Sequence, residues 1–349
     1  MSGRLKLRRG VVVGEAPLTV EIDGEQRQAW ADTALLGEMR EGDEVVVNVE
    51  ALDLGLGSGG FDVVHVNLTR GLKGGGPPAD EHVTKLNYTS IQHAVDPAEL
   101  PVRFIRSGAV KGAPEAARAA IAVLVLPLHG HLAPAAWAVA RAAPGAKVGY
   151  VQTGGGALPG SLSRDVTELR KRGLLCGHLT AGPAYGGEQE AISTLGALDA
   201  AVHELGWDAV LVGPGPGIVG SETRLGHGGI AALESAHASL ALGLPTLLSP
   251  RLSGADPRER HRPVSHHTLT VLELLLAPVE VPVPAGSQVA IETLGDALGE
   301  RHGLREVPAD LEGYAAAGLP AKTMGRTLEQ DPLFFAAPLA AGAALRGKG

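Results

Sequence analysis

Short β-rich runs of alternating and apolar residues, separated by turn residues, occupy the first part of the chain. Glycine, proline and aspartate separate the runs, as at residues 14–17 and 23–24. The runs lie at residues 11–13, 18–22, 26–30, 44–49 and 62–68. Short strands joined by tight turns predict a small N-terminal β-barrel domain over residues 1–70, because a closed barrel leaves no strand edge unpaired.

The pattern changes after a linker, which we place at residues 71–84. Its first part reads Gly-Leu-Lys-Gly-Gly-Gly-Pro-Pro, a flexible and then stiff composition. Apolar runs that predict buried strands follow at 121–127, 147–153, 174–180, 208–213, 245–252 and 279–283, and helix-period segments separate them near 132–143, 159–172, 187–205, 229–242, 264–276 and 287–299. Strands that alternate with helices predict an α/β domain over residues 85–349, with a mainly parallel, doubly wound, Rossmann-like sheet.

The end of the chain is apolar and rich in alanine. Phe334 and Phe335 precede the alanine-rich stretch 336–345. This stretch predicts a C-terminal docking or subunit-contact helix, which Pro338 makes imperfect. We therefore expect a homo-oligomer.

Composition narrows the classes of partner and the compartment. The net charge is −8 and aromatic residues make up 3% of the chain. Both values disfavour nucleic acid and membrane surfaces, because such partners select basic faces and, for single strands, stacking platforms. The single cysteine, Cys176, excludes a disulfide framework, and its apolar neighbours predict a buried thiol. No signal-peptide pattern and no apolar run of membrane-spanning length occurs, so we expect a cytoplasmic protein.

A glycine-rich loop at 213–229 is the most informative stretch of the sequence. It follows the apolar run 208–213, precedes a helix-period segment and holds Gly213, Gly215, Gly217, Gly220, Gly226, Gly228 and Gly229. Strand, glycine loop and helix form an arrangement in which bare backbone N–H groups can face an anion. We predict an anion site here, with Gly217 and Gly220 most sensitive to an added side chain. The alternative is a tight strand-to-helix connection.

A second glycine turn follows another predicted strand. Gly154, Gly155 and Gly156 come directly after the run 147–153. The carboxyl ends of parallel strands lie at one edge of a sheet, where ligands bind. We therefore predict that these three glycines contribute to the same ligand site.

The spacing of Gly215, Gly217 and Gly220 also matches the dinucleotide fingerprint. That fingerprint requires an acidic residue at the end of the next strand. Here the next predicted strand ends in Leu-Ser-Pro-Arg at 248–251, without such a residue. NAD(P) is accordingly disfavoured as a cofactor.

Arginines gather just beyond the predicted strand at 245–252, in a chain that is acidic overall. Arginine side chains suit carboxylate and phosphate oxygens. The arginines predicted to neutralise an anionic ligand are Arg258, Arg260 and Arg262, together with Arg224 of the glycine loop. The alternative is a solvated loop in which Asp256 and Glu259 pair with these arginines.

Histidines in the same region are candidates for proton transfer. His266 or His267 is the expected general acid or base, because imidazole titrates near neutral pH, and Asp256 is a further catalytic candidate. A divalent metal ion is a candidate cofactor. His129 and His131 have the spacing that places two side chains on one face of an extended segment, and one of the pair at 266–267 would complete the site. Adjacent histidines at a helix start diverge, so only one of them is expected to ligate.

Seven short motifs, distributed between residues 85 and 326, carry a resemblance that covers nearly the whole chain. They are Lys85-Leu-Asn-Tyr-Thr-Ser90, Gly154-Gly-Gly-Ala-Leu-Pro159, Gly182-Pro-Ala-Tyr-Gly-Gly187, Gly215-Pro-Gly-Ile-Val-Gly220, Arg258-Glu-Arg-His-Arg262, Ser265-His-His-Thr268 and Thr323-Met-Gly-Arg326. Together they resemble an uncharacterised bacterial family, a domain of unknown function from actinobacterial and clostridial lineages. The resemblance implies a bacterial cytoplasmic protein and brings no established activity, substrate or catalytic residue.

The residues therefore predict an enzyme of hydrolase or transferase type. Its substrate would be a small phosphorylated or carboxylated metabolite, bound at the carboxyl edge of a parallel sheet. A non-catalytic metabolite sensor and a structural oligomer are the alternatives that the sequence leaves open.

Overall fold

The structure is a computed structural model that describes residues 4–55, 59–73, 83–99 and 122–345. The chain forms two compact units, Met1–Glu81 and His82–Gly349. Their boundary falls inside the predicted linker at 71–84, of which residues 74–82 lie outside the described residues. Each unit is described by itself.

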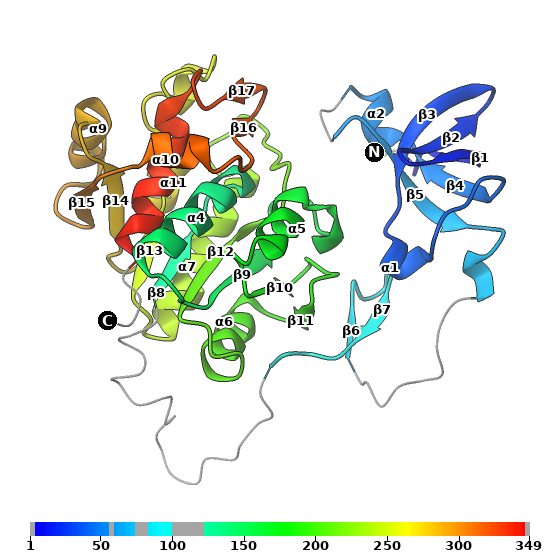
Figure 1. Ribbon diagram of the computed structural model, residues 1–349, viewed down its shortest axis with the longest axis horizontal. Coiled ribbons are helices and arrows are strands. Elements are labelled where there is room, and N and C mark those ends of the chain that lie inside the picture. The colour runs from blue at the N-terminus through cyan, green and yellow to red at the C-terminus, as the bar shows by residue number, and fades with distance from the viewer. Residues whose placement is uncertain (1–3, 56–58, 74–82, 100–121, 346–349) are drawn as a thin grey trace, which may run out of the picture. The chain divides into compact units, whose positions relative to one another are not determined.

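The first unit is a closed five-stranded barrel with the strand order β1-β2-β3-β5-β4, which confirms the predicted barrel (Figure 1). Its strands are β1 (Leu7–Glu15), β2 (Leu18–Ile22), β3 (Glu25–Trp30), β4 (Glu44–Asn48) and β5 (Asp62–Asn67), with short helices α1 (Thr33–Leu36), α2 (Glu50–Asp53) and η1 (Gly71–Lys73) beside them. Parallel pairing of β3 with β5 closes the barrel. Alternate residues point inward, and Val12, Val20, Val45 and Val47 are fully buried.

The second unit is built on an eight-stranded parallel sheet with the order β11-β10-β9-β12-β8-β13-β14-β15. Its strands are β8 (Ala122–Val125), β9 (Val148–Thr153), β10 (Gly177–Ala181), β11 (Gln189–Ala191), β12 (Ala209–Pro214), β13 (Thr246–Leu248), β14 (Glu280–Pro284) and β15 (Gly303–Val307). The predicted doubly wound α/β sheet is thereby confirmed. The two edge strands, β11 and β15, are absent from the sequence-based prediction.

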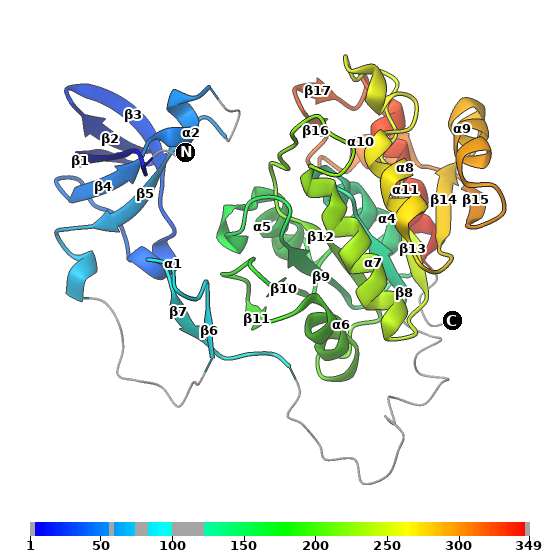
Figure 2. The same ribbon diagram turned by 180° about the vertical axis from the view of Figure 1, so that it is seen from behind.

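Helices cover both faces of this sheet. One face carries α4 (Leu132–Ala142), α5 (Arg164–Lys171), α10 (Leu311–Ala316) and α11 (Pro332–Ala344), and the other carries α6 (Thr194–His203), α7 (Ala231–Ala241), α8 (His266–Leu274) and α9 (Gln288–Leu298) (Figures 1 and 2). Strand β8 serves both layers, because Val123 and Val125 face one core while Leu124 and Leu126 face the other. A strand buried on both faces is apolar throughout, which is why these strands appear in the sequence as continuous apolar runs.

The C-terminal helix α11 docks within its own unit. It packs along α4, where a Cβ on Gly342 would lie 2.5 Å from the Ala135 carbonyl oxygen, so the two backbones approach closely. Phe334, Phe335 and Pro338 are all buried. The expected subunit contact therefore has a different explanation: the helix is apolar because it fills the core of its own domain.

Smaller elements complete the second unit. They are the hairpin β6 (Val83–Lys85) and β7 (His93–Val95), the hairpin β16 (Lys322–Thr323) and β17 (Arg326–Thr327), and the single turns η2 (His129–His131), η3 (Gly160–Leu162), η4 (Gly228–Ile230) and η5 (Glu259–His261). Contrary to expectation, Cys176 is exposed, because it lies in the turn that enters β10 rather than in the strand. Over the described ranges, every helix is too short or too polar to cross a lipid bilayer.

The strand order creates a reversal in the middle of the sheet. From the neighbouring strands β8 and β13 the chain moves toward opposite ends of the sheet. After β8 it passes β12 to form β9, and after β13 it moves away from β8 to form β14. Such a reversal leaves a crevice at the carboxyl edge, which is where doubly wound sheets bind their ligands. The loops that follow β12 and β13 meet at this position.

Candidate functional site

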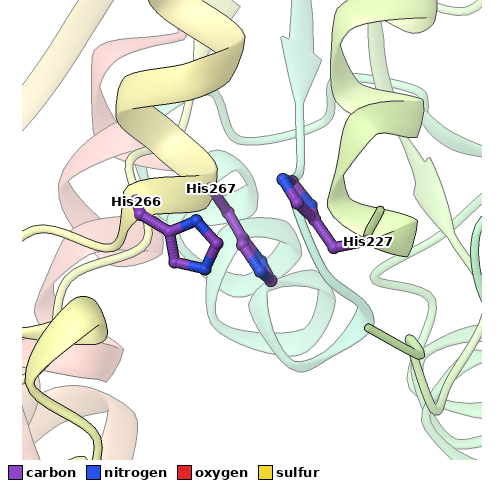
Figure 3. Close-up of side chains that lie close together, drawn as sticks. All are labelled: His227, His266 and His267. Carbon is purple, nitrogen blue, oxygen red and sulfur yellow. The ribbon is translucent and has the colours of Figure 1, made fainter. Parts of the chain in front are cut away.

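Four histidines from these two loops and from the start of α8 lie together, and we call them the histidine cluster: His227, His261, His266 and His267. The rings of His227 and His267 are stacked, with centroids 3.7 Å apart and planes 5° from parallel. The ring of His266 lies 4.4 Å from that of His267 (Figure 3). Within the described chain, the three residues of Figure 3 form a group whose ring nitrogens could hold a metal ion, all lying within 4.8 Å of one another.

Local structure holds these rings in place. Ser265 is the N-cap of α8, and its Oγ accepts a hydrogen bond from the backbone N–H of His267 and lies 2.7 Å from Nδ1 of His261. Gly229 leaves the space that the stacked pair needs, because a Cβ there would lie 3.1 Å from Nδ1 of both His227 and His267. One serine and one glycine therefore position the cluster.

A buried arginine lies against the cluster. Arg251 is 2% exposed, and its Nη1 lies 3.2 Å from Nδ1 of His267. Because a guanidinium group can only donate, Nδ1 of His267 accepts this hydrogen bond and the ring is neutral. Nη2 of Arg251 donates to Asp256, whereas its Nε makes no hydrogen bond to any residue that the structure describes. An unpaired buried donor of this kind is a sign of a missing partner.

The histidines of the cluster are all held in the neutral form. Burial, followed by the positive field of neighbouring groups, lowers the pKa of His267 to about 2 and that of His261 to about 3. Burial also lowers the pKa of His227 and of His266, the latter aided by Arg260 and Arg251. Neutral imidazoles can accept a proton or bind a metal ion, and both roles require a free nitrogen lone pair.

Asp256 lies among three arginines and pairs with each of them. Its carboxylate is fully buried and pairs with Arg258 at 2.9 Å, Arg251 at 3.3 Å and Arg326 at 3.5 Å. Burial by itself would raise the pKa of Asp256, but the hydrogen bonds from Arg258 hold it well below its usual range. The carboxylate thus stays charged and occupied, so the predicted catalytic role for Asp256 does not fit its surroundings, and a positioning role does.

The β16–β17 hairpin brings a third segment to the arginines. Its turn residues Met324 and Gly325 both have positive φ, 44° and 81°, as a tight two-residue hairpin requires. The Met324 sulfur lies 3.6 Å from guanidinium nitrogens of Arg251 and Arg258. Arg326 donates to Asp331 at 3.0 Å. The hairpin therefore borders the arginines.

The glycine loops serve mainly to let two backbones approach. A Cβ on Gly228 would lie 1.8 Å from the carbonyl oxygen of Gly155, and one on Gly156 would lie 2.1 Å from that of Gly215. A hydrogen bond from the Ala157 N–H to the Pro216 oxygen ties the same two loops together. These contacts explain three of the predicted ligand-binding glycines, Gly155, Gly156 and Gly215, as close packing of one loop against the other. A Cβ on Gly154 would meet only the ring of Pro183, at 3.0 Å.

Gly217 and Gly220, the two glycines expected to be most sensitive to an added side chain, make no such close backbone contacts. Gly217 has a positive φ of 73°, but no atom lies within 4 Å of an added Cβ. Gly220 has neither a positive φ nor a contact closer than 3.5 Å. Helix α7 begins only at Ala231, so Gly220 does not open a helix as the dinucleotide fingerprint requires.

The remaining predicted arginines are on the surface. Arg224 pairs with Glu273, and Arg260 pairs with Glu222 at 3.0 Å. Arg262 is exposed. Arg258, with its side chain 42% exposed, is the predicted arginine that stands beside Arg251 and Asp256. Arg260 is thus solvated, as in the alternative for its loop, but its partner is Glu222 and not Asp256 or Glu259.

His129 and His131 do not join the histidine cluster. Both nitrogens of His129 are occupied, with Nε2 2.8 Å from Ser163 Oγ and Nδ1 3.3 Å from the Pro214 oxygen. His131 is fully buried, and its Nδ1 lies 2.9 Å from Ser249 Oγ at the end of β13. The predicted metal site therefore lacks this pair. The expected divergence of His266 and His267 is wrong too, because both face His227 (Figure 3).

The sequence patterns assign no role to four contributors to the site: His227, Arg251, His261 and Arg326. One local feature could have pointed to His227. Like His266 and His267, it follows a strand end and comes just before a helix, and a Gly-Gly pair lies directly after it. Arg326 lies seventy residues from Asp256, so only the tertiary structure could bring it there.

The fold and site agree with a family assignment. The model of the family described as "Protein of unknown function (DUF3866)" matches residues 28–342, and the chain belongs to this family. The match extends from the third barrel strand into helix α11, so it includes every residue of the site. Neither the curated proteins nor the solved structures contain a match to the chain.

Proposed function

We propose that this chain is an enzyme that binds a small phosphorylated or carboxylated metabolite beside Arg251 and catalyses its hydrolysis or a group transfer. The observation that carries the proposal is the buried Arg251 at the carboxyl edge, with an unpaired Nε and a ring of neutral histidines next to it. A guanidinium fork is suited to carboxylate and phosphate oxygens. Arg258 is partly exposed and pairs with Asp256, as Arg251 does, and it would supply a second guanidinium fork.

The histidines give this site its chemistry. His266 is the member of the Figure 3 group with the most solvent access, and its ring is neutral. A neutral imidazole can take a proton from an attacking group and return it to a leaving group. His266 or His267 would act as this general base or acid, while Arg251 neutralises charge that develops on the substrate. A cytoplasmic location and a homo-oligomeric state remain part of the proposal.

Thermal denaturation across a panel of anions tests the proposal. The full chain is melted with phosphate, pyrophosphate, nucleotides and dicarboxylates, at constant ionic strength. A true ligand at a hundred times its Kd stabilises by about 2.7 kcal/mol, equivalent to a rise in Tm of about 5–10 °C for a unit of this size. Any anion that stabilises the chain is then incubated with it, and product formation separates an enzyme from a metabolite sensor.

Variants decide whether the effect belongs to this site. Arg251→Lys keeps the charge but loses the fork, so it should weaken the response at least tenfold. Arg258→Met removes both the charge and the fork at a partly exposed position, so it should also weaken the response, and it guards against misfolding of the first variant. Arg224→Met, on the surface, should respond like the parent chain. An unchanged Tm across the whole panel, or equal responses in all four proteins, would refute the proposal.

A further inference from the structure

His227 is 7% exposed, and neither Nδ1 nor Nε2 makes a hydrogen bond of normal geometry within the described chain. The backbone of Arg224 lies close enough to act on the ring but does not complete such a bond. Leaving buried polar atoms unpaired is unfavourable. The stacked ring of His267 covers the face of His227 but cannot satisfy its nitrogens. A group that approaches a nitrogen of His227 in the plane of its ring is the simplest way to satisfy that nitrogen.

The neighbouring rings supply the rest of a ligand set. His266 and His267 are the first two residues of α8, and together with His227 they present one nitrogen each, all within 4.8 Å of one another (Figure 3). In a tetrahedral site with metal–nitrogen bonds of 2.0–2.1 Å, the ligand nitrogens lie about 3.4 Å apart. Side-chain rotations that move each nitrogen by about an ångström close this difference.

The ligand types narrow the kind of metal ion. Three guanidinium groups near the cluster share two buried carboxylates, Asp256 and Asp331, so a net positive charge remains beside the site and is available to an anion. Three imidazoles without thiolate or carboxylate suit a first-row transition metal and not the oxygen-preferring Mg²⁺ or Ca²⁺.

We propose that His227, His266 and His267 bind a divalent transition-metal ion of the Zn²⁺ class, with water at the remaining position. Three histidines and one open position characterise catalytic zinc sites. Binding requires that the His227–His267 stack opens and that Nδ1 of His267 either ligates or gains a proton. In both cases Nη1 of Arg251 loses its present acceptor and becomes free for an anion.

If the proposed function holds, the metal site favours hydrolysis over group transfer. This inference rests on the proposed function. A metal ion lowers the pKa of its bound water and makes hydroxide available near neutral pH. When the metal is bound, this hydroxide takes the place of His266 or His267 as the base, because both histidines are then ligands. The hydroxide oxygen bonds to the phosphorus or carbonyl carbon of an anionic ester, and the bond to the leaving oxygen breaks. The leaving oxygen takes up a proton from solvent, equal to the one that the water released. The net reaction is ester hydrolysis.

Cobalt binding by the full chain tests the site directly. The protein is freed of metal with a chelator and titrated with Co²⁺, whose visible absorption bands report tetrahedral nitrogen coordination. We expect saturation at one equivalent, and displacement of the bands by Zn²⁺. Elemental analysis after gel filtration should give one retained metal ion per chain.

Three variants identify the ligands. His227→Phe keeps a ring that stacks on His267 but has no nitrogen, and His266→Phe alters a partly exposed position at the helix start. Both should lose retained cobalt, and His227→Phe in the metal-free state should be at least as stable as the parent chain. His203→Ala, outside the cluster on α6, should bind like the parent. No retained metal in the parent, or full retention in both phenylalanine variants, overturns the site.

The two proposals fail independently. If cobalt is not bound but an anion still raises Tm in the metal-free chain, the metal site is wrong and the proposed function stands. If one metal ion is bound by these histidines but no anion stabilises the chain, the metal site stands and the metabolite enzyme is refuted.

Discussion

Substitution of Gly228 by alanine should be far more damaging than the same change at Gly217 or Gly220. The Cβ of an alanine at 228 would lie 1.8 Å from the Gly155 oxygen, whereas real contacts of this type are never shorter than 3.0 Å. The loops that follow β9 and β12 must therefore separate by more than an ångström. The same two loops also meet at Gly156 and Gly215, so their separation would disturb that contact as well.

The magnitude follows from the contacts that would be lost. Forcing a methyl group into a packed site costs about 1–3 kcal/mol. Separation of the loops also strains the hydrogen bond from Ala157 to Pro216, which contributes about 1 kcal/mol. We expect Gly228→Ala to lower the free energy of unfolding by about 3 kcal/mol. For a unit of this size that is a fall in Tm of about 6–12 °C.

The two other glycines serve as matched controls in the same loop. Gly217→Ala meets no atom but adopts a positive φ, so it should cost about 1 kcal/mol. Gly220→Ala has ordinary contacts and an ordinary φ, so its Tm should stay within about 2 °C of the parent. Scanning calorimetry of the full chain gives the order. If Gly228→Ala melts together with Gly220→Ala, the two loops do not pack backbone against backbone and the reasoning is wrong.

Three further predictions concern other parts of the α/β unit. Burial lowers the pKa of His131 to about 3 and that of His178 to about 4, below the usual 6.5. The free energy of unfolding should therefore be highest above pH 6.5 and should fall as the pH drops toward 4. Urea titrations at pH 7, 6 and 5 that give equal free energies would contradict this. Lys85→Met removes a buried ammonium that lies 2.6 Å from Glu190, and should destabilise by about 3–5 kcal/mol in urea unfolding, whereas exposed Lys171→Met should not. Cys176 is exposed, so its thiol should react with a thiol reagent in the native protein. Reaction only after denaturant is added would show that Cys176 is covered.

Pattern alone located most of the fold. Strands β1 to β5, and β8, β9 and β12 to β14, lie at or near the predicted positions, because each faces an apolar core and its residues follow that burial. Strand β15 was missed since Gly-Leu-Arg-Glu-Val is half polar, as suits a sheet edge. Strand β11 lies within a predicted helix at 187–205, because three residues such as Gln-Glu-Ala carry no period and become a strand only by pairing with β10.

The sequence by itself determined the barrel, the parallel sheet and the loops in which site residues would occur, because local spacing and apolar runs report burial directly. Only the tertiary structure decided which of those residues meet. Strands β12 and β13 lie on either side of β8, and the loops that follow them meet, so His227 reaches His266 and His267, while Ser163 and Ser249 engage His129 and His131 elsewhere. The tertiary structure also decided that Gly155, Gly156, Gly215 and Gly228 serve loop packing, because a Cβ clash depends on a neighbour that is distant in sequence.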